Sequence, residues 1–180
     1  MKRMQRVYLV ALVMAWSVGC DQFSKNLAEE NLKYAEPRRY FGNMFRLEYA
    51  ENTGAFLSMG AELPALARTW LFTVLSGVLL AGLLYYVLTH HSFTRKHVFA
   101  LALILGGGSS NLLDRITNDG RVVDFMNMGI GSLRTGIFNF ADVAIMTGMG
   151  LIVFLTFFER SDEQEARDPA LPDGGEPGDS

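Results

Sequence analysis

The chain has 180 residues, 49% of them hydrophobic, and a formal net charge of −3 at neutral pH. The apolar residues are clustered in long runs, which favours a single membrane-embedded domain over a soluble one. The slightly acidic charge gives no indication of nucleic-acid binding, and the single cysteine, Cys20, excludes an internal disulfide.

The first apolar run covers residues 7–20 and follows a basic N-terminus. This arrangement has the shape of a secretory signal peptide, and residues 17–20 are similar to a lipoprotein cleavage and lipidation site. The alternative is a retained membrane helix over about residues 7–27, in which Asp21 and Lys25 share one face and pair. We favour the retained helix, because the segments that follow are long enough to span a membrane themselves.

A mixed polar segment occupies residues 28–64. Within it, apolar and polar side chains alternate over a short stretch, which predicts a strand with one buried face. The apolar positions of this strand are Phe45, Leu47 and Tyr49. The stretch continues into Asn52-Thr53-Gly54, a sequence typical of a turn.

The second apolar run, residues 65–88, is long enough to cross the roughly 30 Å hydrocarbon layer of a bilayer. The loop after it contains three histidines, His90, His91 and His97, which could bind a metal ion. Because no carboxylate or thiol lies near them at ligand spacing, a solvated polar turn is the simpler interpretation, and we expect no metal site.

The third apolar run, residues 98–115, contains a glycine- and serine-rich stretch at residues 106–110. Glycines weaken an isolated soluble helix, but in a membrane small residues let neighbouring helices approach closely. A phosphate-binding loop is not indicated, because no Gly-Lys-Ser/Thr ending follows the glycines.

The fourth apolar run, residues 138–158, is followed by an acidic end rich in glycine and proline, which predicts a disordered tail over residues 161–180. Four spans place both termini on one side of the membrane, and the basic residues near the N-terminus and in the 89–97 loop indicate that this side is the cytoplasm. Residues 1–160 then form one domain, with outer loops at residues 28–64 and 116–137.

This topology brings polar motifs from separate parts of the chain to the outer membrane surface. They are centred on Asp21, Asn52, Asp114, Asp124 and Asp142. Charges at a membrane boundary are costly, so they usually face a partner or a water-filled cavity. Scattered structural charges would not converge in this way, and the convergence predicts a functional site.

Helical spacing groups these residues further. Asn111, Asp114 and Arg115 share one helix face, and Asn139 shares a face with Asp142. Asp114 beside Arg115 predicts an ion pair, although Arg115 could equally reach a lipid headgroup or a substrate carbonyl.

Asp124 and Asp142 have no neighbouring base in the sequence and are candidates for a carboxylate pair. Two adjacent carboxylates tend to share one proton, so that one acts as a base on water while the other donates a proton to a carbonyl. From the residues alone, ion or proton transport through a helix bundle explains the two aspartates about as well. A further alternative is a serine–lysine peptidase. Its candidate residues are Ser24, Ser109, Ser110 and Lys25.

Five motifs of this chain, in their order and spacing, resemble the bacterial lipoprotein signal peptidase (signal peptidase II) family, and the match extends over about residues 7–158. The motifs are Asp21-Gln22-Phe23-Ser24-Lys25, Asn52-Thr53-Gly54-Ala55-Phe56, GGGSSNLLDR at residues 106–115, Val122-Val123-Asp124-Phe125 and Phe138-Asn139-Phe140-Ala141-Asp142. Two features depart from the family pattern. Ser110 stands where glycine is common, and residues 126–137 lack the usual aromatic and proline residues.

The resemblance implies an all-α integral membrane protein of the bacterial inner membrane, with four transmembrane helices and a small extracytoplasmic β-sheet cradle. It implies an aspartic peptidase that works without a cofactor, near the outer face, as a monomer surrounded by membrane lipid. Its substrates would be diacylated prolipoproteins, cut just before the lipidated cysteine, and globomycin-type peptides would inhibit it.

The resemblance also assigns roles to residues by position. Asp124 and Asp142 match the catalytic aspartates. The residues that match positions lining or supporting the site are Asn52, Gly54, Asn111, Arg115 and Asn139. The polar residues with an expected structural role are Asp21, Lys25 and Asp114.

Overall fold

The computed structural model describes residues 1–54, 60, 62–90 and 92–167 and is mostly helical, with a small antiparallel sheet. The elements in chain order are α1 (Arg3–Leu32), β1 (Arg38–Tyr40), β2 (Phe45–Asn52), α2 (Ala65–Arg68), the π-helical segment η2 (Thr69–Leu75), α3 (Ser76–Thr89), α4 (Arg95–Thr117), β3 (Val122–Ile130), β4 (Leu133–Arg134) and α5 (Phe140–Arg167). Three residues named in the sequence analysis, Ala55, Phe56 and His91, lie outside the described residues.

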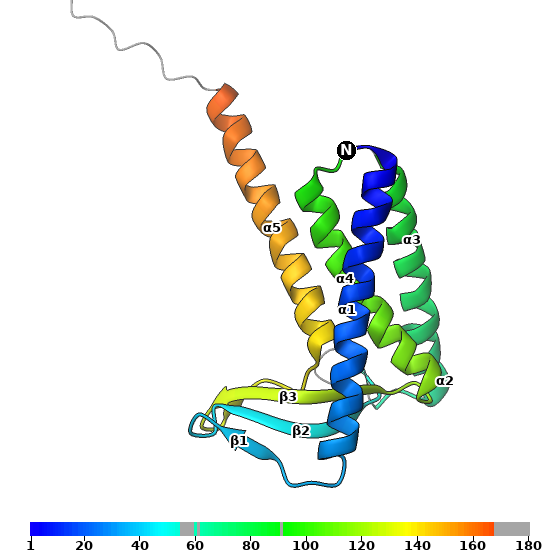
Figure 1. Cartoon of the computed structure of the whole chain (residues 1–180), viewed down its shortest axis with the longest axis vertical. Coiled ribbons are helices and arrows are strands. Elements are labelled where there is room, and N and C mark those ends of the chain that lie inside the picture. The colour runs from blue at the N-terminus through cyan, green and yellow to red at the C-terminus, as the bar shows by residue number, and fades with distance from the viewer. Residues whose placement is uncertain (55–59, 61, 91, 168–180) are drawn as a thin grey trace, which may run out of the picture.

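The helices run alongside one another, and the sheet lies across one end of them (Figure 1). The N-terminus and the distal part of α5 are both at the end opposite the sheet. Helix α1 continues without a break through Cys20. Many large apolar side chains on the outside of the helices are exposed, among them Trp16 at 75% and Leu12 at 70%, as expected for surfaces that face lipid.

Within the described residues, three helical segments are long and apolar enough to cross a membrane: α1, Ala65–Thr89, and the Phe140–Phe158 part of α5. The sequence predicted a fourth span at residues 98–115. Helix α4 covers that range but is not one of the three apolar segments. It carries the polar residues Asn111, Asp114 and Arg115 near its C-terminal end.

The glycine-rich stretch of α4 allows close helix contacts, as predicted. A Cβ atom added at Gly106 would come within 2.6 Å of Ser17 Cβ in α1, and one added at Gly107 would collide with the backbone carbonyl of Ala141 in α5. These two glycines therefore let α4 lie close to α1 and α5 at the level of the buried polar residues.

The sheet has the order β1-β2-β3-β4, with all neighbours antiparallel. Strand β2 contains the stretch whose alternation predicted a strand. Leu47 and Tyr49 of β2 pack with Phe125 of β3 against Ala28 and Leu32 at the end of α1. This contact fixes the sheet to the bundle. It places the start of β3 below the C-terminal end of α4 and the N-terminal start of α5 (Figure 1).

One predicted boundary differs from the structure. The segment expected to be a disordered tail from residue 161 is helical as far as Arg167, as part of α5. Its first residues are rich in Glu, Gln, Ala and Arg, which favour helix and extend the apolar helix into the acidic segment.

Candidate active site

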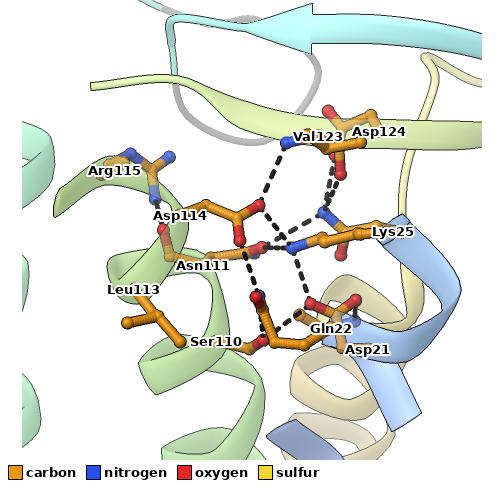
Figure 2. Close-up of polar contacts among 12 residues, drawn as sticks. Asp21, Gln22, Lys25, Ser110, Asn111, Leu113, Asp114, Arg115, Val123 and Asp124 are labelled. Carbon is orange, nitrogen blue, oxygen red and sulfur yellow. Dashed lines mark hydrogen bonds and ion pairs between the residues drawn. The ribbon is translucent and has the colours of Figure 1, made fainter. Parts of the chain in front are cut away.

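Lys25 lies at the centre of a buried ionic cluster between α1 and α4. Its Nζ is 2.6 Å from Asp21 Oδ2 and 2.9 Å from Asp114 Oδ2, and it donates a hydrogen bond to Asn111 Oδ1 at 2.9 Å (Figure 2). Lys25, Asp21 and Asp114 are each at most 3% exposed. The ion pair predicted between Asp21 and Lys25 is thus confirmed, and all three N–H donors of the ammonium group have an acceptor.

The predicted ion pair between Asp114 and Arg115 is wrong, because Asp114 pairs with Lys25 instead. Consecutive residues on a helix point in different directions. Asp114 Oδ2 also accepts a hydrogen bond from Val123 N at 3.1 Å, which ties α4 to β3 (Figure 2). Arg115 turns away and donates to the carbonyl oxygens of Gly54 at 2.9 Å and Asn111 at 3.2 Å.

Asn139 precedes α5 and caps it. Its Oδ1 accepts a hydrogen bond from Asp142 N at 2.9 Å, and Asp142 Oδ2 accepts one from Asn139 N at 3.2 Å. This reciprocal pattern is a capping box, which satisfies two backbone donors at the helix start and orients the Asp142 carboxyl group. The other oxygen, Asp142 Oδ1, accepts a hydrogen bond from Asn111 Nδ2 at 3.0 Å.

Asp124 lies on β3 opposite Ala50 of β2 and is only 2% exposed. Its Oδ1 accepts a hydrogen bond from Asn139 Nδ2 at 2.6 Å, and its Oδ2 accepts one from Asn52 Nδ2 at 3.0 Å. Asn52 is itself oriented by Gly54 N, which donates to its Oδ1 at 2.9 Å. The start of the Asn52-Thr53-Gly54 segment thus forms the turn that the sequence predicted.

The side chain of Asn139 connects the two aspartates, since it caps the helix turn that carries Asp142 and donates directly to Asp124. Burial raises the pKa of Asp124 from its ordinary value of 3.8 to about 7. The hydrogen bond from Asn52 opposes this rise in pKa, and the charge of Asp142 adds to it. A carboxyl group that titrates near neutrality next to a second carboxyl group can exchange a proton during a reaction.

Two residues contact the ionic cluster in a way that the sequence did not predict: Gln22, which had no expected role, and Ser110, which was considered only as a candidate nucleophile. Gln22 Nε2 donates to Asp114 Oδ1 at 2.6 Å and to Ser110 Oγ at 3.0 Å, and Ser110 Oγ donates to Asp21 Oδ2 at 2.7 Å. Both lie inside motifs that were identified, and Ser110 is four residues before Asp114 on the same helix face. That four-residue spacing is the feature of the sequence from which a contact of Ser110 with the cluster could have been predicted.

Two of the histidines, His90 and His97, and the serine–lysine candidates Ser24 and Lys25 make local contacts. His90 stacks on Tyr86, and His97 Nδ1 lies 2.8 Å from Thr94 Oγ1, at the start of α4. Ser24 Oγ donates to the Asp21 carbonyl of its own helix at 2.7 Å. Lys25 is already engaged with three acceptors, so it is not placed as a free base for a serine.

A cavity of about 510 Å³ opens beside Asp142, between the η2–α3 segment, α4 and α5. Its amide and charged lining residues are Asn111, Arg115 and Asp142, and they lie at the sheet end of their helices. The rest of the lining is mostly apolar and includes Leu79 and Met149. Phe72, which also lines the cavity, places its ring 5.9 Å below the Arg115 guanidinium. The site is therefore an apolar pocket with a carboxyl group at one end.

Comparisons with known proteins agree with one another. The model of the family described as signal peptidase (SPase) II matches residues 13–158. A lipoprotein signal peptidase from Halalkalibacterium halodurans is 34% identical over 160 residues, which is 89% of this chain and 95% of that protein. A lipoprotein signal peptidase from Cupriavidus taiwanensis is 36% identical over 133 residues, which is 74% of this chain and 73% of that protein. A solved bacterial membrane enzyme shares the fold, with a TM-score of 0.72, 21% identity and 94% of each chain covered.

Proposed function

The chain belongs to the signal peptidase II family, and we propose that it is a membrane aspartic endopeptidase that removes signal peptides from prolipoproteins. Its cleavage site is just before the cysteine that carries the diacylglyceryl group. The observation that carries the proposal is the position of Asn139, which contacts both Asp124 and Asp142. Asp142 in turn lines the polar end of an apolar cavity.

In the proposed mechanism a water molecule lies between Asp124 and Asp142 and attacks the scissile carbonyl directly. One aspartate removes the proton from water while the other donates a proton to the carbonyl oxygen, and no acyl-enzyme forms. The buried position of Asp124 supports this scheme, because a raised pKa lets the pair hold one proton near neutral pH.

The amide side chains hold the two carboxyl groups in place. Asn52 and Asn139 donate to Asp124, and Asn111 donates to Asp142. Such donors keep each carboxyl group in one orientation without adding a charge. We assign Asn52, Asn111 and Asn139 as positioning residues on this basis.

Arg115 and Gly54 form the edge of the site. Arg115 donates to the Gly54 carbonyl at 2.9 Å and lines the cavity beside Asp142. Its guanidinium is placed to hold the turn over the site and to meet a carbonyl or phosphate group of the substrate. The cluster of Asp21, Lys25 and Asp114 has a structural role, because all of its ionic groups are paired and buried.

The apolar cavity is the proposed site for the lipid-modified part of the substrate. It lies between helices whose outer surfaces are apolar, so a substrate whose acyl chains remain in the bilayer can enter from the side. A volume of about 510 Å³ is within the range of pockets that hold small apolar ligands.

We further propose that α4 is a fourth span, that both termini are cytoplasmic and that the aspartates lie near the outer face. The buried pairing of Lys25 with Asp114 supports a membrane position for α4, because it neutralises charges that would be costly alone. Impermeant thiol labels at Glu36→Cys and Ser92→Cys, each in a Cys20→Ser background, should react from opposite sides. Reaction from the same side would contradict this topology.

The function is tested with the purified full chain and a synthetic prolipoprotein carrying a diacylglyceryl cysteine. Mass spectrometry should find one new N-terminus at that cysteine, and the unlipidated peptide should be a poor substrate. Globomycin-type peptides should inhibit the reaction. No cleavage of the lipidated precursor, together with proton or ion flux in liposomes, would favour a transporter instead.

A further inference from the structure

Three arginines from three strands form a row on one face of the sheet. Arg39 of β1 is directly opposite Arg46 of β2, and Arg46 is opposite Asn127 of β3. Arg134 of β4 completes the row through a hydrogen bond from its Nε to Asn127 Oδ1. Residues opposite each other in an antiparallel pair point to the same face. We refer to Arg39, Arg46 and Arg134 as the arginine row.

The arginine row lies on the face of the sheet that does not pack on α1. In β2, Leu47 packs on α1, and Arg46, the residue before it, points to the opposite face. Arg39 is opposite Arg46 and shares that face. The side chains of Arg39 and Arg46 are exposed and partly exposed there, so a ligand can reach them from outside the bundle.

The row carries positive charge that the described residues do not neutralise. Like charges directly opposite in a sheet are destabilising, and the ion pairs of the described chain include none of these three arginines. Arg46 and Arg134 instead contact Asn43, and Arg134 has a buried terminal nitrogen without a hydrogen-bond partner among the described residues. Glu48, two residues after Arg46 in β2, forms no ion pair with these arginines among the described residues.

Beside the row, the turns at the far end of the sheet expose large apolar side chains. These are Phe41 (81% exposed), Met44 (51%), Ile130 (72%) and Leu133 (82%), which we call the hairpin tips. A hydrogen bond from Gly129 N to Met44 O at 2.8 Å joins the two turns. The sheet projects sideways from the ends of the helices, so the tips lie to one side of the bundle (Figure 1).

We propose that the arginine row and the hairpin tips together bind an anionic membrane lipid. Guanidinium groups bind phosphate oxygens in a planar, bidentate geometry, and the exposed tips require an apolar partner next to that anion. An anionic phospholipid supplies both in one molecule. The sheet stands at one end of helices that are apolar enough to cross a membrane, which is the level of the headgroups.

Net negative charge distinguishes this ligand from a zwitterionic phospholipid, whose headgroup cation the arginines would repel. An acidic peptide would satisfy the arginines but would leave the tips exposed to water. The proposal concerns membrane contact and not cleavage, so it holds or fails independently of the proposed peptidase function.

The test uses the full chain in nanodiscs, with Leu133→Cys in a Cys20→Ser background labelled with an environment-sensitive fluorophore. Phosphatidylcholine discs receive increasing amounts of phosphatidylglycerol, and quenching by a lipid bearing a nitroxide near the headgroup reports contact. Quenching should rise with the anionic fraction. The fraction needed for half-maximal quenching should increase about fivefold for each arginine removed, in Arg39→Gln and in Arg39→Gln/Arg46→Gln, which corresponds to ~1 kcal/mol per arginine.

Arg38→Gln is the matched control, because Arg38 is opposite Leu47 and therefore lies on the other face of the sheet. It removes the same charge one residue away and should leave the quenching curve unchanged. A label at Glu36, in the loop before β1, should be quenched less than the label at residue 133.

Three results would overturn the proposal. They are equal quenching in discs with and without phosphatidylglycerol, equal effects of Arg38→Gln and Arg39→Gln, and selective loss of quenching in inorganic phosphate compared with chloride at the same ionic strength. The last result would assign the arginines to free anions. Arg39 makes no side-chain hydrogen bond or ion pair with the described residues, so its variant should fold normally.

Discussion

Asn139 Nδ2 donates a hydrogen bond to Asp124 Oδ1 at 2.6 Å, across the junction between α5 and β3. The same side chain caps α5 through its Oδ1, which accepts from Asp142 N. One fully buried amide therefore sets the helix start that carries Asp142 and the carboxyl orientation of Asp124. Its two functions can be separated by substitution.

Asn139→Ser should retain the helix cap but lose the donor to Asp124, whereas Asn139→Ala should lose both. Serine is a good N-cap residue, and replacing a cap by alanine costs about 1 kcal/mol. We therefore expect both variants to lose turnover, and the alanine variant alone to lose marked thermal stability. Turnover and unfolding temperature in the same detergent provide the comparison. Full activity in Asn139→Ser would show that the contact with Asp124 is dispensable.

Lys25→Met should destabilise the protein strongly, because it leaves the carboxylates of Asp21 and Asp114 buried without their cation. Breaking a buried ion pair from one side typically costs about 3–5 kcal/mol. The triple variant Lys25→Met/Asp21→Asn/Asp114→Asn removes the unpaired charges and should recover part of the folded yield. Size-exclusion profiles and thermal unfolding measure both effects.

Lys33→Met is the control for this prediction, since Lys33 also pairs with a glutamate four residues away but is 29% exposed. Exposed ion pairs contribute little to stability, so only a small change is expected. If Lys33→Met and Lys25→Met destabilise the protein equally, the structural role assigned to the buried cluster is incorrect.

The pH dependence of cleavage should reflect a carboxyl group that titrates near pH 7, because burial raises the pKa of Asp124 to about 7. Activity should fall on both sides of an optimum, and the apparent pKa values belong to the aspartate pair. Asn52→Ala removes a hydrogen bond that lowers this pKa. The apparent pKa near neutrality in the pH–activity profile should therefore move to higher pH. An unchanged profile in that variant would be inconsistent with the contact.

Stability should depend on pH through the same group. The folded-state pKa of Asp124 lies above its ordinary value of 3.8, so between pH 4 and about 7 the folded protein holds a proton that the unfolded chain has released. The free energy of unfolding therefore decreases as the pH rises through this range. Asp124→Asn should be more favourable to stability at pH 8 than at pH 5, relative to the original protein. Thermal unfolding at both values tests the sign.

Filling the cavity should weaken substrate binding more than chemistry. Ser76→Phe adds bulk to a lining position, and we expect a higher KM with a smaller change in kcat. Gly82→Leu, on the same helix, is the control, because a Cβ added there meets no atom within 4 Å. Equal KM values for the two variants would indicate that the substrate does not use this cavity.

The sequence predicted contacts between residues of the same helix, because these follow from helical spacing alone. The pairing of Asp21 with Lys25 follows from four-residue spacing. The second partner of Lys25 is Asp114 on α4, and that contact depends on how α1 and α4 pack, which the sequence does not specify. For the same reason Arg115 was paired with its neighbour in sequence and not with the Gly54 carbonyl.

Strand β3 was not predicted, although it carries Asp124. The first six residues of Val122–Ile130 are all buried, so the strand lacks the alternation of apolar and polar side chains that identified β2. The family resemblance selected Asp124, but its position beside Asn139 and Asn52 required the tertiary structure.

The central claim is that Asp124 and Asp142 activate water, and the most direct measurement is the turnover of a diacylated prolipoprotein by Asp124→Asn and Asp142→Asn. Asp119→Asn, in the turn before β3, is the control for loss of one carboxyl group. Each active-site variant should lose on the order of 10²–10⁴-fold in kcat while folding normally, and the control should keep full activity. Substantial turnover in either active-site variant, or a covalent adduct trapped on a serine, would contradict the account.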